Sequence, residues 1–354
     1  MTKFSKYFAI GLLMSALSSS SIALPRFAAK VEQKCNLCHV SPTGGGMRNA
    51  YGSQYFALTE LAVHKTPFEE ISKFQPFVSE NISLGLDMRT LYFYDEMTKQ
   101  STFFQMQGSF YISAQLDDKF SVAFDKGLYG DGFEIYGMGY ILPFNGLFRV
   151  GKFKPAYGWH FDDHTSFVRE RMIWPPGYSD TGIEFGIYPY GISANLGFFN
   201  GLNSQFDNGK GKAIAGRVEF RKHISKIGLG GGGSYYLNDS PAGDISMYGP
   251  MYYITLGRLV YMGELDWLDD KTVDRKSFAT THALSYMATQ GVWINATYDF
   301  HDKNIEVKNG SLTRYGLGLN YFPIGFLEIQ PNIRLYDDEA ETYYQYNTQF
   351  HFFF

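Results

Sequence analysis

About sixteen segments of roughly ten residues, spread between Ser79 and Phe354, alternate apolar with polar side chains and are separated by turn residues. Alternation with a period of two indicates a strand with one apolar face and one wet face. Repeated over segments of this length, it is typical of an outer-membrane barrel. We therefore predict an all-β fold, a transmembrane antiparallel β-barrel of about sixteen strands. The segments lie near 81–94, 103–116, 119–127, 132–142, 147–153, 181–189, 191–199, 212–222, 226–237, 245–257, 259–268, 277–289, 291–300, 312–322, 325–336 and 342–354.

The connections between these segments alternate in length. Tight turns, such as the one at 143–146, take every second position, and longer polar stretches lie between them. Outer-membrane barrels keep short turns on the periplasmic side and long loops outside. An even number of strands then places both ends of the barrel on the periplasmic side. The last segment is aromatic and ends at Phe354, which looks like the signal read by the bacterial outer-membrane assembly machinery.

Composition supports a wall that faces lipid on one side and water on the other. Aromatic residues make up 18% of the chain, with 27 Tyr and 32 Phe, yet the mean hydropathy is -0.21. No stretch reaches the roughly 18 apolar residues of a transmembrane helix. A soluble periplasmic β-sandwich is the alternative, but it would not need so many aromatics or a terminal Phe.

The first residues have the pattern of a secretory signal. Lys3 and Lys6 precede an apolar run, and small residues end at Ala23, so we expect residues 1–23 to be absent from the mature protein. Removing these two lysines changes the formal charge from -4 to -6. A negative chain argues against a nucleic-acid partner. The predicted organisation is a signal peptide over 1–23, a small module over 24–78 with a short helix near 54–63, and the barrel over 79–354.

Residues Cys35-Asn36-Leu37-Cys38-His39 contain the only two cysteines of the chain. C-x-x-C-H is the attachment pattern of a c-type haem: the two thiols bond to the vinyl groups, and the imidazole ligates the iron. We predict one covalent haem c on Cys35 and Cys38, with His39 as proximal ligand. A disulfide or redox dithiol is the alternative, although so small a loop constrains an unfolded chain little. A zinc site would need further ligands.

The second axial position of the iron has two candidates inside the small module, Met47 and His64. A thioether ligand would raise the reduction potential relative to an imidazole. A residue of the barrel or an open position are the other possibilities. The Gly44-Gly45-Gly46 run that follows the motif suits a backbone passing close to the haem, or a flexible hinge.

The longest connection, 154–180, is rich in charged and aromatic residues. Its candidate functional residues are His160, Asp162, Asp163, His164, Arg169, Glu170, Arg171, Trp174, Pro175 and Pro176. A loop of this length in a compact domain is usually functional. The loop is third among the predicted outer loops, and in general porins the third loop folds inward. Asp162, Asp163 and His164 suit a divalent metal, with a solvated acidic loop tip as the alternative. We expect Arg169 and Arg171 to face the lumen as partners of acidic groups or haem propionates.

Two further outer connections are acid-rich and would raise the local cation concentration at the mouth. Their acidic residues are Asp266, Asp269, Asp270 and Asp274 in one, and Asp337, Asp338, Glu339 and Glu341 in the other.

The chain as a whole resembles the fused monohaem cytochrome-porins of the outer membrane, known from iron-oxidising bacteria. The resemblance is carried by residues 23–28 before the motif, by Cys35, Cys38 and His39, by residues 49–52, and by the barrel ending in Phe354. Segments 151–158, 167–171 and 180–182 look like the phosphate-selective porin superfamily. The resemblance implies a barrel plugged by the haem module, with electrons passing from extracellular Fe(II) to periplasmic cytochromes. The triple glycine and the short chain depart from that pattern.

The predicted function is therefore an outer-membrane electron conduit with Fe(II) oxidase activity. Its expected partners are extracellular Fe(II) or another redox donor, a periplasmic c-type cytochrome and outer-membrane lipid, and its oligomeric state is open. One rival is a passive porin whose haem-bearing segment is a plug or gate, and another is outward electron transfer. A weaker rival is haem catalysis on peroxide or nitrogen oxides. A conduit with a single haem requires that haem to lie in the barrel's mouth or lumen.

Overall fold

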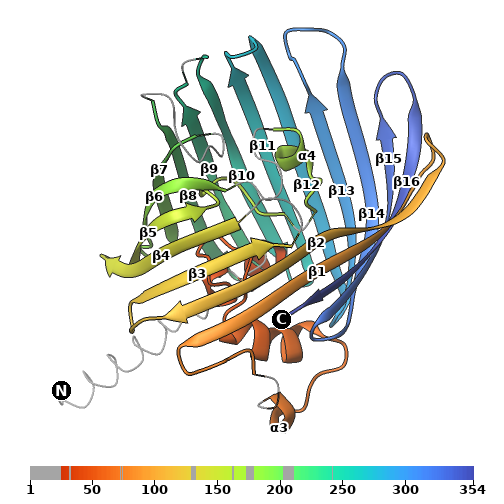
Figure 1. Cartoon of the computed structure of the whole chain (residues 1–354). Coiled ribbons are helices and arrows are strands. Elements are labelled where there is room, and N and C mark those ends of the chain that lie inside the picture. The colour runs from red at the N-terminus through yellow and green to blue at the C-terminus, as the bar shows by residue number, and fades with distance from the viewer. Residues whose placement is uncertain are drawn as a thin grey trace, which may run out of the picture.

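The computed structural model describes residues 25–31, 33–71, 73, 75–128, 133–161, 163–172, 179–201, 211–240 and 242–354. The predicted signal peptide lies outside these residues. Sixteen strands form one closed barrel (Figure 1). They are β1 Ile82–Asp95, β2 Gln100–Gln115, β3 Phe120–Gly127, β4 Phe133–Leu142, β5 Gly146–Phe153, β6 Asp180–Ile187, β7 Ile192–Phe199, β8 Ala213–Ile224, β9 Ile227–Asn238, β10 Ile245–Leu256, β11 Leu259–Asp270, β12 Arg275–Thr289, β13 Val292–Asp302, β14 Ser311–Ile324, β15 Leu327–Asp337 and β16 Thr342–Phe353.

Every strand pairs antiparallel with its neighbours in the chain, and β1 closes the barrel against β16. At this seam Asp87 is opposite Phe353 and Asp95 is opposite Gln345. The backbone of Phe354 donates to the carbonyl of Leu86 at 3.0 Å, so the last residue is tied to the first strand. The prediction of an antiparallel barrel of about sixteen strands is confirmed.

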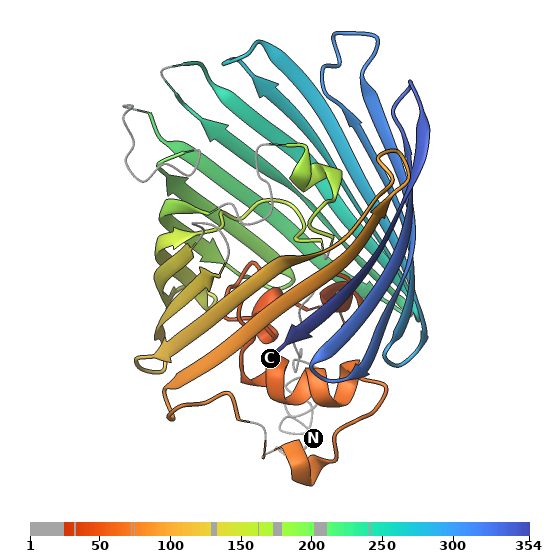
Figure 2. The same ribbon diagram turned by 45° about the vertical axis from the view of Figure 1, so that its right-hand side comes forward.

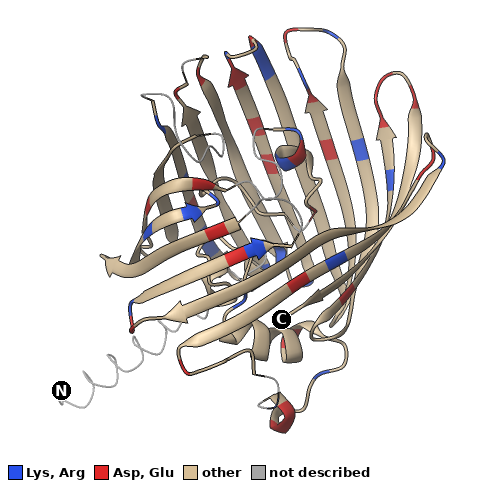
Figure 3. Cartoon of the chain, in the orientation of Figure 1, with Lys and Arg blue, Asp and Glu red and all other residues tan. Residues whose placement is uncertain are grey.

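Side chains alternate between the two faces of the wall, as the pattern predicts. In β16, Tyr344, Tyr346, Phe350 and Phe352 are exposed on the outer face, with 37 to 44% of each accessible. The intervening residues of the same strand, such as Asn347, are buried on the lumen side. Figure 3 shows the charged residues on the strands and on the short helical segment inside the barrel. The polar residues of the alternating pattern therefore line the barrel interior.

The N-terminal segment enters the barrel at the end where the short turns lie, and the C-terminus lies at the same end (Figures 1 and 2). Its elements are α2 Pro25–Val31, a 3₁₀ turn η1 Cys35–Leu37, the π-helix η2 Tyr51–Leu61 and the short helix α3 Phe68–Ile71. The predicted helix near 54–63 is thus η2, which begins three residues earlier. None of the helices in the described part of the chain is long and apolar enough to cross a membrane.

Helix η2 lies across this mouth and is held by the short turns of the wall. Gln290 Nε2 donates to the carbonyls of Thr59 and Ala62 at 2.9 and 2.8 Å. The backbone of Val63 donates to Phe322 C=O at 2.9 Å. At the β14–β15 turn, a Cβ on Gly325 would come within 2.5 Å of Leu58 Cδ2, so glycine permits this close approach.

Helix α2 packs against β9 to β11, and its Arg26 and Phe27 side chains contact β13 to β15. Arg26 donates to Asn320 Oδ1 at 3.0 Å and lies 3.9 Å from Glu328 Oε1. The Phe27 ring meets Trp293 edge to face, with centroids 5.2 Å apart. The N-terminal segment from 25 to 64, called the plug below, is therefore fixed to the wall by an ion pair and by aromatic packing.

Candidate functional site: a Cys-x-x-Cys-His turn inside the barrel

The motif residues lie on one tight turn of the plug. The amides of Cys38 and His39 donate to the carbonyl of Cys35 at 3.3 and 3.1 Å, which brings the two cysteines and the histidine together. Cys35, Cys38 and His39 are all buried, and the two cysteines are not joined in a disulfide. Burial raises the pKa of the Cys35 thiol. The structure thus collects the three predicted haem-binding residues at one place.

A glycine hairpin follows the turn. Val40 N–H donates to Met47 C=O at 3.0 Å, and His39 forms a β-bridge with Arg48. The three glycines between them have φ values of +88°, +73° and +62°, a left-handed conformation that other residues rarely adopt. A Cβ on Gly44 would come within 3.1 Å of Cys35 Sγ. The triple glycine thus permits a left-handed hairpin that closes over Cys35.

Asn49 joins the motif turn to helix η2. Its backbone N–H donates to Cys38 C=O at 2.9 Å, and its side-chain amide donates to Asn36 C=O at 2.9 Å. Its side-chain oxygen accepts from Gly52 N–H at 3.0 Å. A Cβ on Gly52 would lie 2.2 Å from Cys38 O, closer than any real contact. These two residues of the 49–52 stretch therefore have a structural role next to the thiols.

The His39 ring is oriented by the same hairpin. Its Nδ1 lies 3.3 Å from the carbonyl of Gly46, so Nδ1–H donates and Nε2 is the remaining ligand atom. Burial lowers the pKa of His39 to about 4, which keeps the ring neutral near pH 7. Neutral imidazole is the form that ligates metals.

Two thiols and an oriented imidazole on one turn are the donor set that covalent haem requires. The free space beside Cys35 is small, about 20 Å³, which holds one water. Lys34, Arg217, Glu219 and Arg221 border it. The donor set fits a haem, and loading it requires the hairpin or the neighbouring side chains to give way.

The two distal candidates are placed differently. Met47 is buried, with its side chain against the wall, where a Cβ on Gly85 of β1 would be 3.4 Å from Met47 Cγ. His64 is exposed beyond the far end of η2, where its N–H donates to Pro323 C=O at 3.1 Å. Helix η2 separates His64 from the motif turn. The distal ligand stays a prediction.

The long connection after β5 folds into the lumen and crosses to the opposite wall, where its short helix α4 Phe167–Glu170 lies (Figure 2). Tyr157 OH donates to Asp266 Oδ1 at 2.7 Å, and Trp159 N–H to Glu264 Oε2 at 2.5 Å. Arg169 pairs with Glu264 at 3.1 Å. The inward fold expected for this loop, and a lumen-facing Arg169, are present. Residues 154–172 are called the inner loop below.

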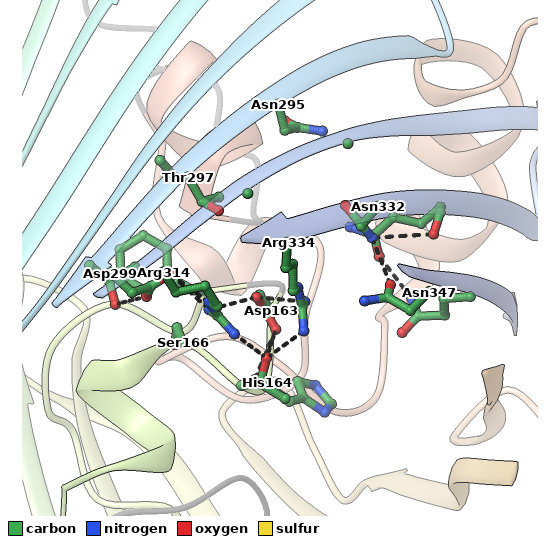
Figure 4. Close-up of a pocket in the computed structure, with 18 of the residues that line it drawn as sticks. Asp163, His164, Ser166, Asn295, Thr297, Asp299, Arg314, Asn332, Arg334 and Asn347 are labelled. Atoms are coloured by element: carbon green, nitrogen blue, oxygen red, sulfur yellow. Dashed lines mark hydrogen bonds and ion pairs between the residues drawn. The ribbon is translucent and has the colours of Figure 1, made fainter. Parts of the chain in front are cut away.

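Asp163 anchors the tip of the inner loop. Arg314 and Arg334, from β14 and β15, lie 3.1 and 2.8 Å from Asp163 Oδ2 (Figure 4). These two guanidinium groups hold the pKa of Asp163 well below its usual range. His164 Nε2 accepts from Arg89 at 3.1 Å. Asp163 is thus paired with two arginines, which makes the loop tip an ion-paired anchor. In the described part of this loop, no three His, Cys, Asp or Glu side chains are arranged to hold a metal ion. Asp162, Trp174, Pro175 and Pro176 lie outside the described residues.

Between the inner loop and β12 to β16 lies a chamber of about 110 Å³, room for several waters. Amide and hydroxyl side chains form the largest group in its lining, beside charged and apolar residues, and include Asn295, Thr297, Gln330, Asn332, Asn347 and Gln349. Sequence reasoning did not identify this chamber, because alternation separates lumen from lipid and cannot say which lumen residues meet. It also placed Asp266 in an outer loop; that residue is buried in β11 facing Tyr157.

Comparison with known proteins agrees with this geometry. The sequence matches no protein-family model and no curated protein. Among solved structures, OprB of Pseudomonas putida aligns with a TM-score of 0.60 and 10% identity over 84% of this chain and 100% of that chain. Outer-membrane expressed OmpT of Vibrio cholerae aligns at 0.58 and 11% identity over 79% of this chain and 100% of that one. An anion-selective porin from Comamonas acidovorans aligns with a TM-score of 0.55 and 11% identity, over 77% of this chain and 99% of that chain. The chain therefore has the fold of an outer-membrane porin.

Proposed function

We propose that this protein is an outer-membrane electron conduit in which one covalent haem c, held by the plug, lies inside a porin-like barrel. The observation that carries the proposal is the position of the motif turn. A haem hanging free of the barrel could not bridge the membrane. A haem on a turn enclosed by the wall could.

The wall surrounds the motif turn and its hairpin on several sides. Cys35 lies beside Arg221 of β8, and Ser41 Oγ accepts from Arg149 of β5 at 3.3 Å. Arg48 stacks over Phe353 of β16 at 3.9 Å. These contacts reach three separated strands, so a group bonded to the turn would be insulated from lipid by the barrel.

In this proposal Cys35 and Cys38 hold the haem through thioether bonds, and His39 Nε2 ligates its iron. The bound haem supplies a one-electron couple. The chain's own residues orient the ligand through Gly46 and shield the site from bulk water. The proposed donor is extracellular Fe(II) or another reduced species, and a periplasmic c-type cytochrome is the acceptor.

The charge of the outer loops suits a cationic donor. Asp337, Asp338 and Glu341 lie on or beside the long connection between β15 and β16 at the rim. Carboxylates at a mouth raise the local concentration of cations. The chamber further in is lined by amides and by paired charges, so a cation would meet less attraction there. The proposal therefore places donor contact at the outer rim or the inner loop.

A passive porin with a plug is the second candidate, and the fold likeness to porins favours it. Single-channel conductance separates the two, because a conduit needs no ion flow. A measurable open-pore current in the intact protein, unaffected by haem removal, would support the porin.

The test of the conduit is Cys35→Ala in the intact protein. We expect loss of covalent haem staining and of Fe(II) oxidation, with the barrel still inserted in the outer membrane. Persisting oxidation in that variant would refute the proposal. Ser41→Ala is the control, because it changes the same hairpin without touching a haem donor.

A further inference from the structure

The first turn of η2 forms an aromatic bridge from the motif turn to the surface of the barrel mouth. The Tyr51 ring packs against the cluster formed by Cys35 and Cys38. The Tyr55 ring lies one helical turn further, with its centroid 5.3 Å from that of Tyr51 and the rings tilted by 33°. Tyr55 is 41% exposed. Two side chains therefore span the distance from the thiols to solvent.

Other sides of the motif turn are covered by the barrel. Cys35 faces Arg217 and Arg221 of β8, both bridged by Glu219. The glycine hairpin faces the inner loop, where a Cβ on Gly45 would be 3.7 Å from His160 Nδ1. A protein partner cannot reach the motif turn through the wall or through the inner loop. The Tyr51 side opens to the mouth.

The surface around Tyr55 combines apolar side chains with negative charge. Over residues 54–80 the described exposed charges are four carboxylates, Glu60, Glu69, Glu70 and Glu80, against two lysines, Lys65 and Lys73. Phe68 is 79% exposed and Val63 36%. Glu60 is close enough to influence the Tyr51 hydroxyl electrostatically. This is the composition of a transient interface, an aromatic centre with a charged rim.

The opposite side of the same mouth carries positively charged side chains. The β8–β9 turn and its flanks contain Lys222, His223 and Lys226, all exposed. The neighbouring β6–β7 turn carries Tyr190, which is 90% exposed. An aromatic residue is therefore available on each side of the mouth, one in an acidic and one in a basic setting.

We propose that electrons leave the haem through Tyr51 and Tyr55, and that the acidic surface around Tyr55 docks a periplasmic cytochrome with a lysine-rich rim. This proposal rests on the proposed function, because it needs a haem on the motif turn. With a haem bound to the motif turn, the transfer would move one electron from that haem to an oxidised partner cytochrome, and no bond would form or break. Complementary charge steers such an encounter and sets its rate.

The test is stopped-flow mixing of the purified, dithionite-reduced holoprotein in detergent with an oxidised lysine-rich c-type cytochrome. Tyr55→Ala should lower the second-order rate constant about tenfold, since aromatic anchors dominate small interfaces. Glu60→Gln should lower it about threefold and weaken its dependence on ionic strength. Tyr55→Phe keeps the ring and should react like the parent.

The matched controls lie on the basic side of the mouth. Tyr190→Ala and Lys226→Gln should change the rate constant by less than about twofold. The haem spectrum and midpoint potential should be the same in every variant, which separates a docking defect from a damaged haem site.

Two results would overturn the proposal. If Tyr55→Ala reacts like the parent while Tyr190→Ala is slow, the partner docks on the basic side and the conduit itself stands. If the parent protein carries no covalent haem, the proposed function fails and this route fails with it. The haem spectrum of the parent therefore distinguishes the two failures before any rate is measured.

Discussion

The plug and the inner loop both fill the lumen, but they satisfy their polar groups in different ways. The inner loop depends on the wall: Phe167 N–H donates to Asp299 of β13 at 3.1 Å, and Asp163 is paired with arginines of β14 and β15. The motif turn of the plug depends mostly on itself, through Asn49, the glycine hairpin and the His39–Gly46 contact. The conformation of the inner loop thus depends on contacts with the barrel wall. The motif turn is a local unit that the barrel encloses.

This difference has a functional meaning. A turn that holds a haem, as we propose for the motif turn, would benefit from internal hydrogen bonds, because the surrounding contacts would change when the haem binds. A loop that narrows a lumen benefits from charged partners on the far wall, because the unpaired backbone groups of a crossing segment need partners. Substitutions that affect one of the two regions and spare the other test this difference.

The largest effect is expected at Arg314. Its guanidinium is 1% exposed and lies 2.8 Å from Asp299, which is fully buried. Arg314→Leu should lower the free energy of unfolding by about 3–5 kcal/mol, because it leaves the buried Asp299 carboxylate without its arginine and leaves Asp163 with Arg334 alone. Urea unfolding of the detergent-folded barrel measures this. Lys276→Leu, which removes an exposed pair with Glu306, should leave the unfolding curve almost unchanged.

The same Arg314→Leu variant tests whether the two regions are independent. Limited proteolysis should cut within the inner loop faster than in the parent, while the plug should keep its resistance. Equal loosening of both regions would show that the plug also depends on the loop, contrary to the comparison.

A smaller effect is expected at Gly52. An alanine there would press on Cys38 O, and overpacking of this kind costs about 1–3 kcal/mol. Proteolysis should then loosen the plug and leave the inner loop intact. Gly137→Ala is the matched control, since nothing lies within 4 Å of a Cβ at that position of β4. Equal protease sensitivity in the two alanine variants would speak against the close packing of η2 on the motif turn.

The effect that is smallest near neutral pH, and that grows on acidification, is a pH dependence of the inner loop. Burial and the positive charge of Arg89 lower the pKa of His164 to about 3, so the folded loop keeps this ring neutral while the unfolded chain protonates it near pH 6.5. Stability should therefore be level above about pH 6.5 and fall as the pH drops toward 3, by less than about 1.4 kcal/mol per unit. Comparison of unfolding curves for the parent and His164→Gln measures it, and the variant should show the flatter profile. If the free energy of unfolding of the parent protein rises on acidification, the folded inner loop does not keep His164 neutral.

The strands were predictable to within a few residues because alternation reports the two faces of a wall directly. The segment near 245–257 is β10 Ile245–Leu256, and the segment near 191–199 is β7 Ile192–Phe199. The motif residues were predictable because their chemistry is local. The anchors of the inner loop were not, since Asp299 lies 132 positions from Phe167 in the chain and alternation carries no information on which lumen residues meet. The aromatic bridge at Tyr51 and Tyr55 was missed for a related reason: nothing in the spacing marks the exposed face of a π-helix.

The central claim is that Cys35, Cys38 and His39 hold a haem inside the barrel, and the most direct measurement is a pyridine haemochrome spectrum of the purified protein together with the mass of the intact chain. We expect the spectrum of a haem c, one haem per chain retained after denaturation, and no thiol that reacts with an alkylating reagent. A chain of unmodified mass with two alkylatable thiols, or with those thiols joined in a disulfide, would contradict it.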